Sequence, residues 1–113
     1  PPGVMRDATP EEEAVFPHIC AAFLSYLLNL KAAGNQAKVK PDSAKVYARG
    51  LLDLFLYDGK APSEMATQAY RAAVEWTFED VACQRQHTSL LKHFGVFWEE
   101  RGSQPFEGAP DVD

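Results

Sequence analysis

Long apolar runs are absent from this chain of 113 residues. No run approaches the roughly 18–20 apolar residues that a membrane-spanning helix requires, so we expect no contact with a membrane. The most apolar stretch, residues 19–30, is interrupted by Ser25 and Asn29, which indicates a buried helix of a globular domain.

Cysteine is also scarce, with Cys20 and Cys83 as its two occurrences in the sequence. Both fall within predicted helices, whereas a disulfide framework needs more cysteines, usually in loops. We therefore expect two buried thiols in a reducing compartment, which predicts an intracellular protein, nuclear or cytoplasmic. The chain begins Pro-Pro-Gly without an initiator methionine or a signal-peptide pattern, and this favours a segment of a longer protein.

Recognisable catalytic motifs are missing as well. The sequence has no nucleophile elbow, no phosphate-binding loop and no histidine-based triad. Glu75, Glu79 and Asp80 share one predicted helix, where a solvated face is the simplest interpretation. We therefore predict that the chain is not an enzyme and uses no cofactor.

Histidine and cysteine offer a single candidate set of metal ligands. Cys83 and His87 are four residues apart and would share a helix face, but His18 and Cys20 are two apart and would diverge. Tetrahedral zinc sites usually have tighter ligand pairs, so we interpret the four as core cysteines and boundary histidines and predict no bound metal.

Strand-like alternation is absent, and helical spacing of apolar residues is found throughout residues 14–102. We predict an all-α fold, a compact bundle of four to five helices, as a single domain over 14–102. Residues 1–13 would form an acidic lead-in and residues 103–113 a linker or tail. The predicted core consists of Phe23, Leu27, Leu51, Phe55, Tyr70, Val74, Phe78, Leu91 and Phe94.

Capping signals place the first two helices. Thr9 and Glu12 form a capping box, and Gly34 would end the first helix, with a kink or a break at Pro17 left open. The second helix is predicted to begin at Pro41 and to end before Gly59.

The later helices have fewer boundary signals. The third would begin at Pro62 and bury residues as far as Val81, and the fourth would be capped by Thr88 or Ser89. Gly50 and Gly95 lie inside predicted helices. Close approach of two helices, or a local loss of helix stability that the fold tolerates, would each explain a glycine at these positions.

Negative charge is concentrated at the two ends of the chain. The net charge is −5, yet residues 14–98 contain nine Lys or Arg against seven Asp or Glu, and residues 31–49 have a net charge of +4. A second polar stretch, residues 84–93, contains no acidic residue. Because both stretches are predicted to open helices, whose free N–H groups suit phosphates, they predict a nucleic-acid contact, although a solvated helix end explains each residue taken singly.

Two segments also carry a resemblance to a known family. In the segment "SAKVYARGLLDLFLYDG", the residues that match the pattern of that family are Ser43, Lys45, Tyr47 and Leu51. In the segment "QRQHTSLLKHFGVFWEERG", the matching residues are Thr88, Leu91, Phe94, Phe97 and Gly102. In this order of elements the chain resembles, over residues 14–102, the SAM-like core-binding domain at the N-terminus of tyrosine recombinases and phage-type integrases. Ala44 and Val46 are less polar than the usual start, and the negative net charge is a further departure.

The resemblance implies a module that clamps duplex DNA while a separate domain carries out strand chemistry. The contacts that it implies are Lys38, Lys40, Lys45, Arg49, Arg85, His87, Thr88 and Lys92.

A helical protein-interaction domain is the alternative that composition favours equally. The acidic ends and overall negative charge suit such a domain. So small a core would not bury all four of the later aromatic side chains, which predicts an exposed aromatic patch among Trp76, Phe78, Phe97 and Trp98.

Overall fold

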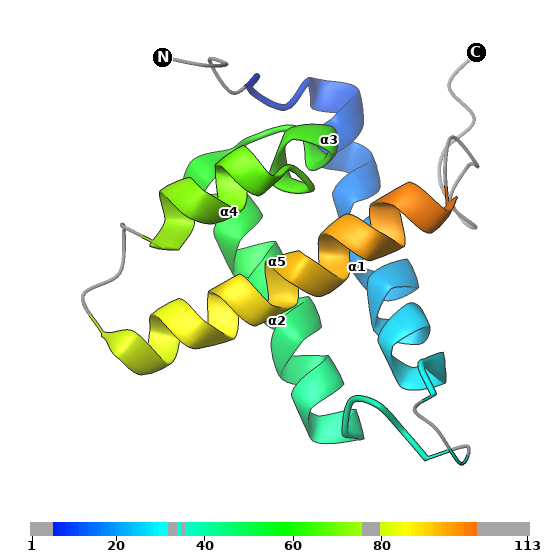
Figure 1. Cartoon of the computed structure of the whole chain (residues 1–113). Coiled ribbons are helices and arrows are strands. Elements are labelled where there is room, and N and C mark those ends of the chain that lie inside the picture. The colour runs from blue at the N-terminus through cyan, green and yellow to red at the C-terminus, as the bar shows by residue number, and fades with distance from the viewer. Residues whose placement is uncertain (1–5, 32–33, 35, 76–79, 102–113) are drawn as a thin grey trace.

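The computed structural model describes residues 6–31, 34, 36–75 and 80–101. Over these residues the fold is all-helical, which confirms the predicted class (Figure 1). The helices of this described part are α1 (Pro10–Asn29), α2 (Pro41–Asp58), α3 (Pro62–Met65), α4 (Gln68–Glu75) and α5 (Val81–Arg101). None of them is long and apolar enough to cross a membrane.

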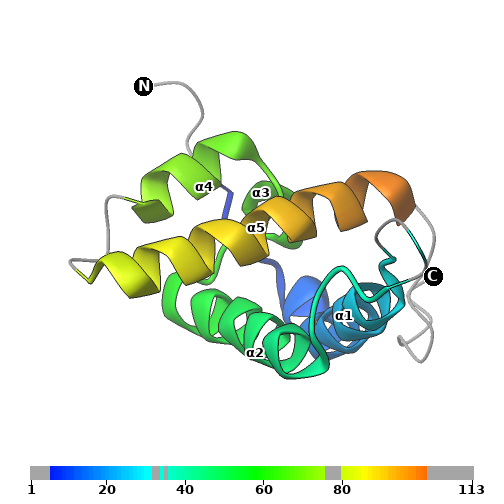
Figure 2. The same ribbon diagram turned by 60° about the horizontal axis from the view of Figure 1, so that its bottom comes forward.

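The helices form two layers. α1 and α2 run antiparallel in one layer, and α5 crosses both of them from the other layer, with α4 beside it (Figure 2). Aromatic rings fill the space between helices: Phe16 of α1 stacks on Phe55 of α2 at a centroid distance of 3.8 Å. Phe23 of α1 meets Phe94 of α5 edge-on at 5.5 Å. The core therefore lies where α5 crosses the α1–α2 pair.

The predicted core is confirmed at every described position. Eight of the nine residues are buried, and the ninth, Phe78, lies outside the described residues. Tyr70 also finds a polar partner, because its hydroxyl donates to Asp58 Oδ2 at 2.6 Å. Burial, followed by this hydrogen bond, raises the pKa of Tyr70, so its ring packs in the core as a neutral group.

The N-terminus of α1 confirms the predicted capping box. Glu12 N donates to Thr9 Oγ1 at 3.2 Å, and Thr9 N donates to Glu12 Oε1 at 3.0 Å. The helix then continues through Pro17 without a break. It ends at Asn29, earlier than predicted, because Leu30 is extended and its carbonyl accepts a hydrogen bond from Lys38 N at 3.1 Å.

Residues 6–9 pair with the α2–α3 connection. Ala8 N donates to Gly59 O at 2.8 Å, Ala61 N donates to Arg6 O at 3.0 Å, and the Asp7 carboxylate binds Lys60 Nζ at 2.8 Å. Because α1 itself begins at Pro10, the segment predicted as a lead-in is in large part built into the fold.

The predicted third helix is divided in two. Thr67 separates α3 from α4: its hydroxyl donates to Glu64 O at 2.7 Å and accepts from Tyr70 N at 3.1 Å, which caps α4. Val81, predicted to be buried by this helix, is instead 54% exposed and opens α5.

The last helix begins seven residues before Thr88, and this corrects the predicted start. Asp80 provides the cap, with its Oδ1 accepting from Ala82 N at 2.9 Å. The early start places Cys83 on the first turn, where it is exposed, so the prediction of two buried thiols is wrong at Cys83. Cys20 is buried as predicted, and its burial raises the pKa of that thiol to about 12.

Glycine marks the point where α2 and α5 meet. A Cβ on Gly50 would lie 2.8 Å from Leu90 Cδ2, closer than real contacts allow. A Cβ on Gly95 would lie 3.2 Å from the Ala66 carbonyl oxygen. Close helix approach is therefore the explanation for Gly50. At the end of α2, Gly59 adopts φ 64° and donates its N–H to Phe55 O, which confirms the predicted stop.

Candidate nucleic-acid interface

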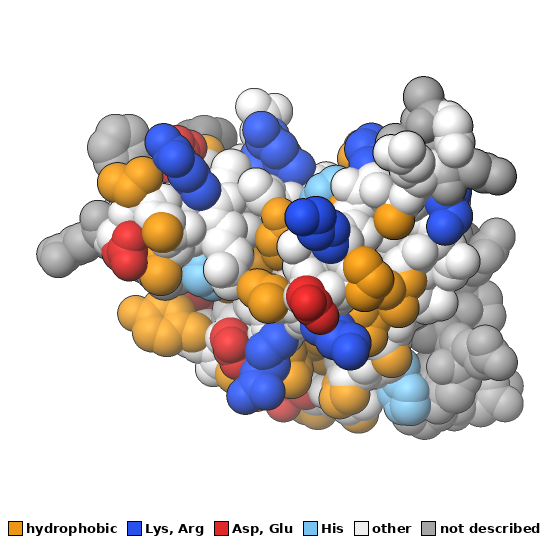
Figure 3. Space-filling view, turned by 90° about the horizontal axis from the view of Figure 1, so that it is seen from below, with side chains coloured by type: hydrophobic (Ala, Val, Ile, Leu, Met, Phe, Trp, Pro, Cys, Tyr) orange, Lys and Arg blue, Asp and Glu red, His pale blue; other side chains and the backbone are white. Residues whose placement is uncertain are grey.

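Two segments hold the predicted contacts, the first half of α2 with the residues just before it and most of α5, and both lie at the α2–α5 crossing. Residues 38–49 and 81–98, all of them described, contain six Lys or Arg, with Asp42 as the single acidic residue. This local charge of +5 contrasts with −5 for the whole chain. Figure 3, seen towards the N-terminal end of α2, shows Lys and Arg side chains spread over the face, with acidic and hydrophobic side chains between them.

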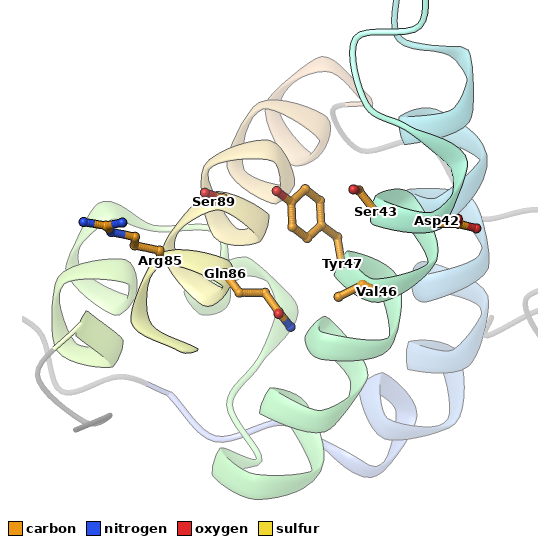
Figure 4. A pocket seen from close by; sticks show the side chains of 7 residues that line it. All are labelled: Asp42, Ser43, Val46, Tyr47, Arg85, Gln86 and Ser89. Atoms are coloured by element: carbon orange, nitrogen blue, oxygen red, sulfur yellow. The ribbon is translucent and has the colours of Figure 1, made fainter. Parts of the chain in front are cut away.

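A shallow hollow of about 390 Å³ lies between the two helices. We call it the α2–α5 hollow. Figure 4 shows the hydroxyl of Tyr47 directed towards Ser89, while the guanidinium of Arg85 points outward. Its lining residues are Asp42, Ser43, Val46, Tyr47, Arg85, Gln86 and Ser89. Hydroxyl and amide groups thus line the hollow together with one cation, Arg85, and one carboxylate, Asp42.

Neighbouring depressions gather most of the other predicted contacts. Lys45 and Arg49 of α2 border one depression together with His87 of α5. On the α4 side of α5, Arg85, Thr88 and Lys92 border another, which also includes Glu75. The fold therefore places six of the eight predicted residues around the N-terminal half of α5.

Lys38 and Lys40 lie at the other end of the crossing. Lys40 is exposed and is the N-cap of α2, where no side chain caps the first turn. Lys38 is exposed near His93 of α5, whose ring lies 5.9 Å from that of Tyr47. Burial and, to a smaller extent, the charge of Lys38 lower the pKa of His93, so its neutral form is favoured near neutral pH.

Some predicted contacts already have partners within the chain. Arg49 Nε lies 3.4 Å from Asp53 Oδ1, four residues along α2, and both side chains are exposed, so solvent screens this pair. His87 Nδ1 donates to the carbonyl of Cys83 at 2.7 Å. Thr88 lies in the middle of α5, so the predicted phosphate site at a helix start near residue 88 is wrong. The free helix start of this surface belongs to α2.

Several residues of the hollow were not predicted as contacts. Ser43 and Tyr47 were noted only as matches to the family pattern, and Ser89 as a possible helix cap, whereas all three are half-exposed and line the hollow. Their i, i+4 spacing offered a signal: Ser43 precedes Tyr47 by four residues, as Arg85 precedes Ser89. The spacing shows a shared helix face, but only the crossing brings the two faces together.

The aromatic patch expected for a protein-interaction domain is not found at its described members. Phe97 is buried, and Trp98 is half-buried beside Phe94, with Arg101 over its ring at 5.4 Å. Trp76 and Phe78 lie outside the described residues. The large apolar side chains most exposed in the described part are instead Leu56 and Tyr57 of α2.

Metal-binding potential is limited in the same part of the chain. Among the described residues, no three His, Cys, Asp or Glu side chains form a group that could hold a metal ion. Cys20 is in the core and Cys83 on the surface, so the two cysteines differ in environment.

Comparison with known proteins gives no relative: no protein-family model, no curated protein and no solved structure matches this chain. The resemblance to recombinase core-binding domains therefore stays a prediction that rests on the sequence pattern.

Proposed function

We propose that this chain is a non-catalytic helical module that binds the backbone of duplex DNA along the α2–α5 crossing. The supporting observation is the clustering of four cations from two distant segments. Lys45 and Arg49 of α2 border one depression and Arg85 and Lys92 of α5 border another, and the α2–α5 hollow shares lining residues with both. In a chain with a net charge of −5, such a cluster is a locally favourable surface for phosphate groups.

The chemistry of the surface suits the backbone more than the bases. Exposed lysine and arginine neutralise phosphates, while the hydroxyl groups of Ser43, Tyr47 and Ser89 can bind phosphate or sugar oxygens. Lys40 adds a charge beside the uncapped first turn of α2, whose N–H groups favour an anion. Cations separated by acidic and hydrophobic side chains would make discrete phosphate contacts, which position a duplex without reading its sequence.

Titration of duplex DNA against salt concentration tests this proposal. Each phosphate contact contributes about 0.9 to the slope of log K against log salt. Arg85→Ala/Lys92→Ala should therefore reduce the slope by up to about 1.8 and weaken binding to all duplex sequences alike. The matched control, Arg71→Ala/Arg101→Ala, removes the same amount of positive charge. Neither position lines the α2–α5 hollow or its two neighbouring depressions, so the control should change the slope by less.

The acidic tail supplies a test in the opposite direction. Residues 103–113 contain Glu107, Asp111 and Asp113, and their neutralisation to Gln and Asn should strengthen binding by reducing repulsion. Equal losses of affinity in Arg85→Ala/Lys92→Ala and in Arg71→Ala/Arg101→Ala would show that binding depends on net charge alone. A lack of measurable affinity at about 50 mM salt would overturn the DNA proposal, because phosphate contacts are strong at low salt concentration.

A further inference from the structure

The solvent face of α2 has a symmetrical pattern of exposure. Between residues 45 and 57, all of them described, six side chains are exposed and the others are buried or half-buried. Leu56 is 71% exposed and Tyr57 is 76% exposed, although both are large and apolar. The six exposed residues are Lys45, Val46, Arg49, Asp53, Leu56 and Tyr57.

Their spacing is that of a coiled-coil seam. Val46, Arg49, Asp53 and Leu56 follow one another at intervals of three, four and three residues, with Lys45 and Tyr57 as flanks. The series reads the same from either end, about a midpoint at Leu51. A second α2 laid antiparallel across this midpoint would therefore present the same positions in the same order.

The chemistry of the face is complementary about that midpoint. In the antiparallel arrangement, Val46 would pack against Leu56 and Tyr57 of the second copy, and the aliphatic stem of Lys45 would lie beside the same Leu56. Arg49 would lie opposite Asp53 of the second copy, and the reverse contact would occur by symmetry. A parallel arrangement would place Arg49 near its own counterpart and Asp53 near its own, which is unfavourable.

We propose that this face of α2 is the interface of a symmetric, antiparallel self-association of the chain. A second copy is the occupant that the charges favour, because the face carries both members of the ion pair that it would need and places them symmetrically. The apolar ends and the central charge pair together define one register. The observations behind this inference do not depend on the DNA proposal, but Lys45 and Arg49 belong to both surfaces, so self-association and phosphate contact would compete for these two residues.

The size of the face sets the strength of the association. Six side chains per copy are far fewer than the 20–30 residues of a standard interface, so the association should be weak and dependent on concentration. Gln86 and His87 of α5 border the face beside Arg49 and can add contact area. Because Lys45 and Arg49 would lie in the interface of the associated form, phosphate contacts would then be made by Lys38, Lys40, Arg85 and Lys92.

Sedimentation equilibrium of the full chain between about 20 µM and about 1 mM, the range of weak interfaces, tests the proposal. The average mass of the wild type should rise with concentration from 12.5 kDa towards twice that value. Asp53→Arg places two arginines opposite each other and should keep the chain monomeric. Arg49→Asp/Asp53→Arg restores opposite charges and should restore the association.

A further variant distinguishes the proposed contact between Arg49 and Asp53 of the second copy from a general effect of net charge on association. Glu99→Arg changes the net charge by the same amount at an exposed position of α5 and should leave the association unchanged. Circular dichroism should show the same helicity in all four proteins, because every altered side chain is exposed. A monomeric wild type at about 1 mM, association that persists in Asp53→Arg, or a double swap that fails to restore it would each overturn the proposal.

Discussion

The two halves of α5 differ sharply in burial although they belong to one continuous helix. Between residues 81 and 89, all described, no side chain is buried. Between residues 90 and 98 the helix buries Leu90, Leu91, Phe94 and Phe97. Leu90, which meets Gly50 of α2, is the first residue of the buried half.

This difference separates the residues that hold the helix from those that it displays. The buried half is fixed against Phe23 of α1 and Gly50 of α2, and Figure 1 shows the exposed half extending past α2. Helical hydrogen bonds and the Asp80 cap keep the exposed half regular without a core of its own. Polar residues such as Arg85 are therefore displayed on a rigid support, which is an advantage for binding because little ordering is needed.

The largest effect is expected from Phe94→Ala in the buried half. Phe94 is fully buried and contacts the rings of Phe23, Phe97 and Trp98, so its truncation should reduce the free energy of unfolding by about 3–5 kcal/mol. Val96→Ala, at an exposed position of the same half, should change it by no more than about 0.5 kcal/mol. Urea denaturation measures both values. Similar losses in the two variants would contradict the assignment of the core.

Gly50→Ala should have the next largest effect, because it acts where the two halves join. The added Cβ would overlap Leu90, which has no exposed surface and little room to move. Overpacking costs about 1–3 kcal/mol and exceeds or offsets the gain of about 1 kcal/mol in helix propensity, so we expect a net loss of up to about 2 kcal/mol.

A double-mutant cycle identifies the cause of that loss. In a Leu90→Ala background the overlap is gone, and Gly50→Ala should then be neutral or stabilising. If the cost of Gly50→Ala is the same in both backgrounds, the close approach to Leu90 is not the reason for the glycine.

His93, on the flank of the buried half, should make stability depend on pH. Burial and the charge of Lys38 lower its pKa below the ordinary value of 6.5, so protonation favours the unfolded chain. The stabilisation is complete above about pH 6.5 and is lost as pH falls through this value towards the lower folded pKa. Urea denaturation at two pH values on either side of 6.5 should show the loss, and His93→Gln should reduce it.

Lys38→Gln sharpens this test. Removing the charge of Lys38 should raise the pKa of His93 part of the way towards its ordinary value, since burial is the larger cause and remains. An NMR titration of the His93 ring measures both pKa values directly. A wild-type value at or above 6.5 would contradict the prediction.

The smallest effect on stability is expected in the exposed half. Arg85→Ala removes a side chain that points into solvent, so the free energy of unfolding should stay within about 0.5 kcal/mol of the wild type. The same variant should weaken DNA binding in the salt titration. A large loss of stability would show that the exposed half also holds the fold, and the contrast between the halves would fail.

The predicted contacts show which residues of a binding site can be selected from the sequence and which cannot. Lys45, Arg49, Arg85 and Lys92 could be selected from local charge, and the fold places them around one crossing. The pattern failed at Thr88, which has the chemistry of an N-cap but lies inside α5. The residue that caps α5 is Asp80, which is described and comes directly after residues 76–79, which are not. The spacing of apolar residues did not mark Asp80 as a helix start.

The sequence by itself determined the helical class, the capping box of Thr9 and Glu12, the stop at Gly59 and the apolar core positions. These features depend on interactions between residues within about one helical turn, or on the average burial of apolar side chains. Only the tertiary structure decided that Gly50 meets Leu90 and that Ser43 and Tyr47 face Gln86 and Ser89 across one hollow. Those pairs lie about forty residues apart in the chain, and their contact depends on how two helices cross, which no local spacing encodes.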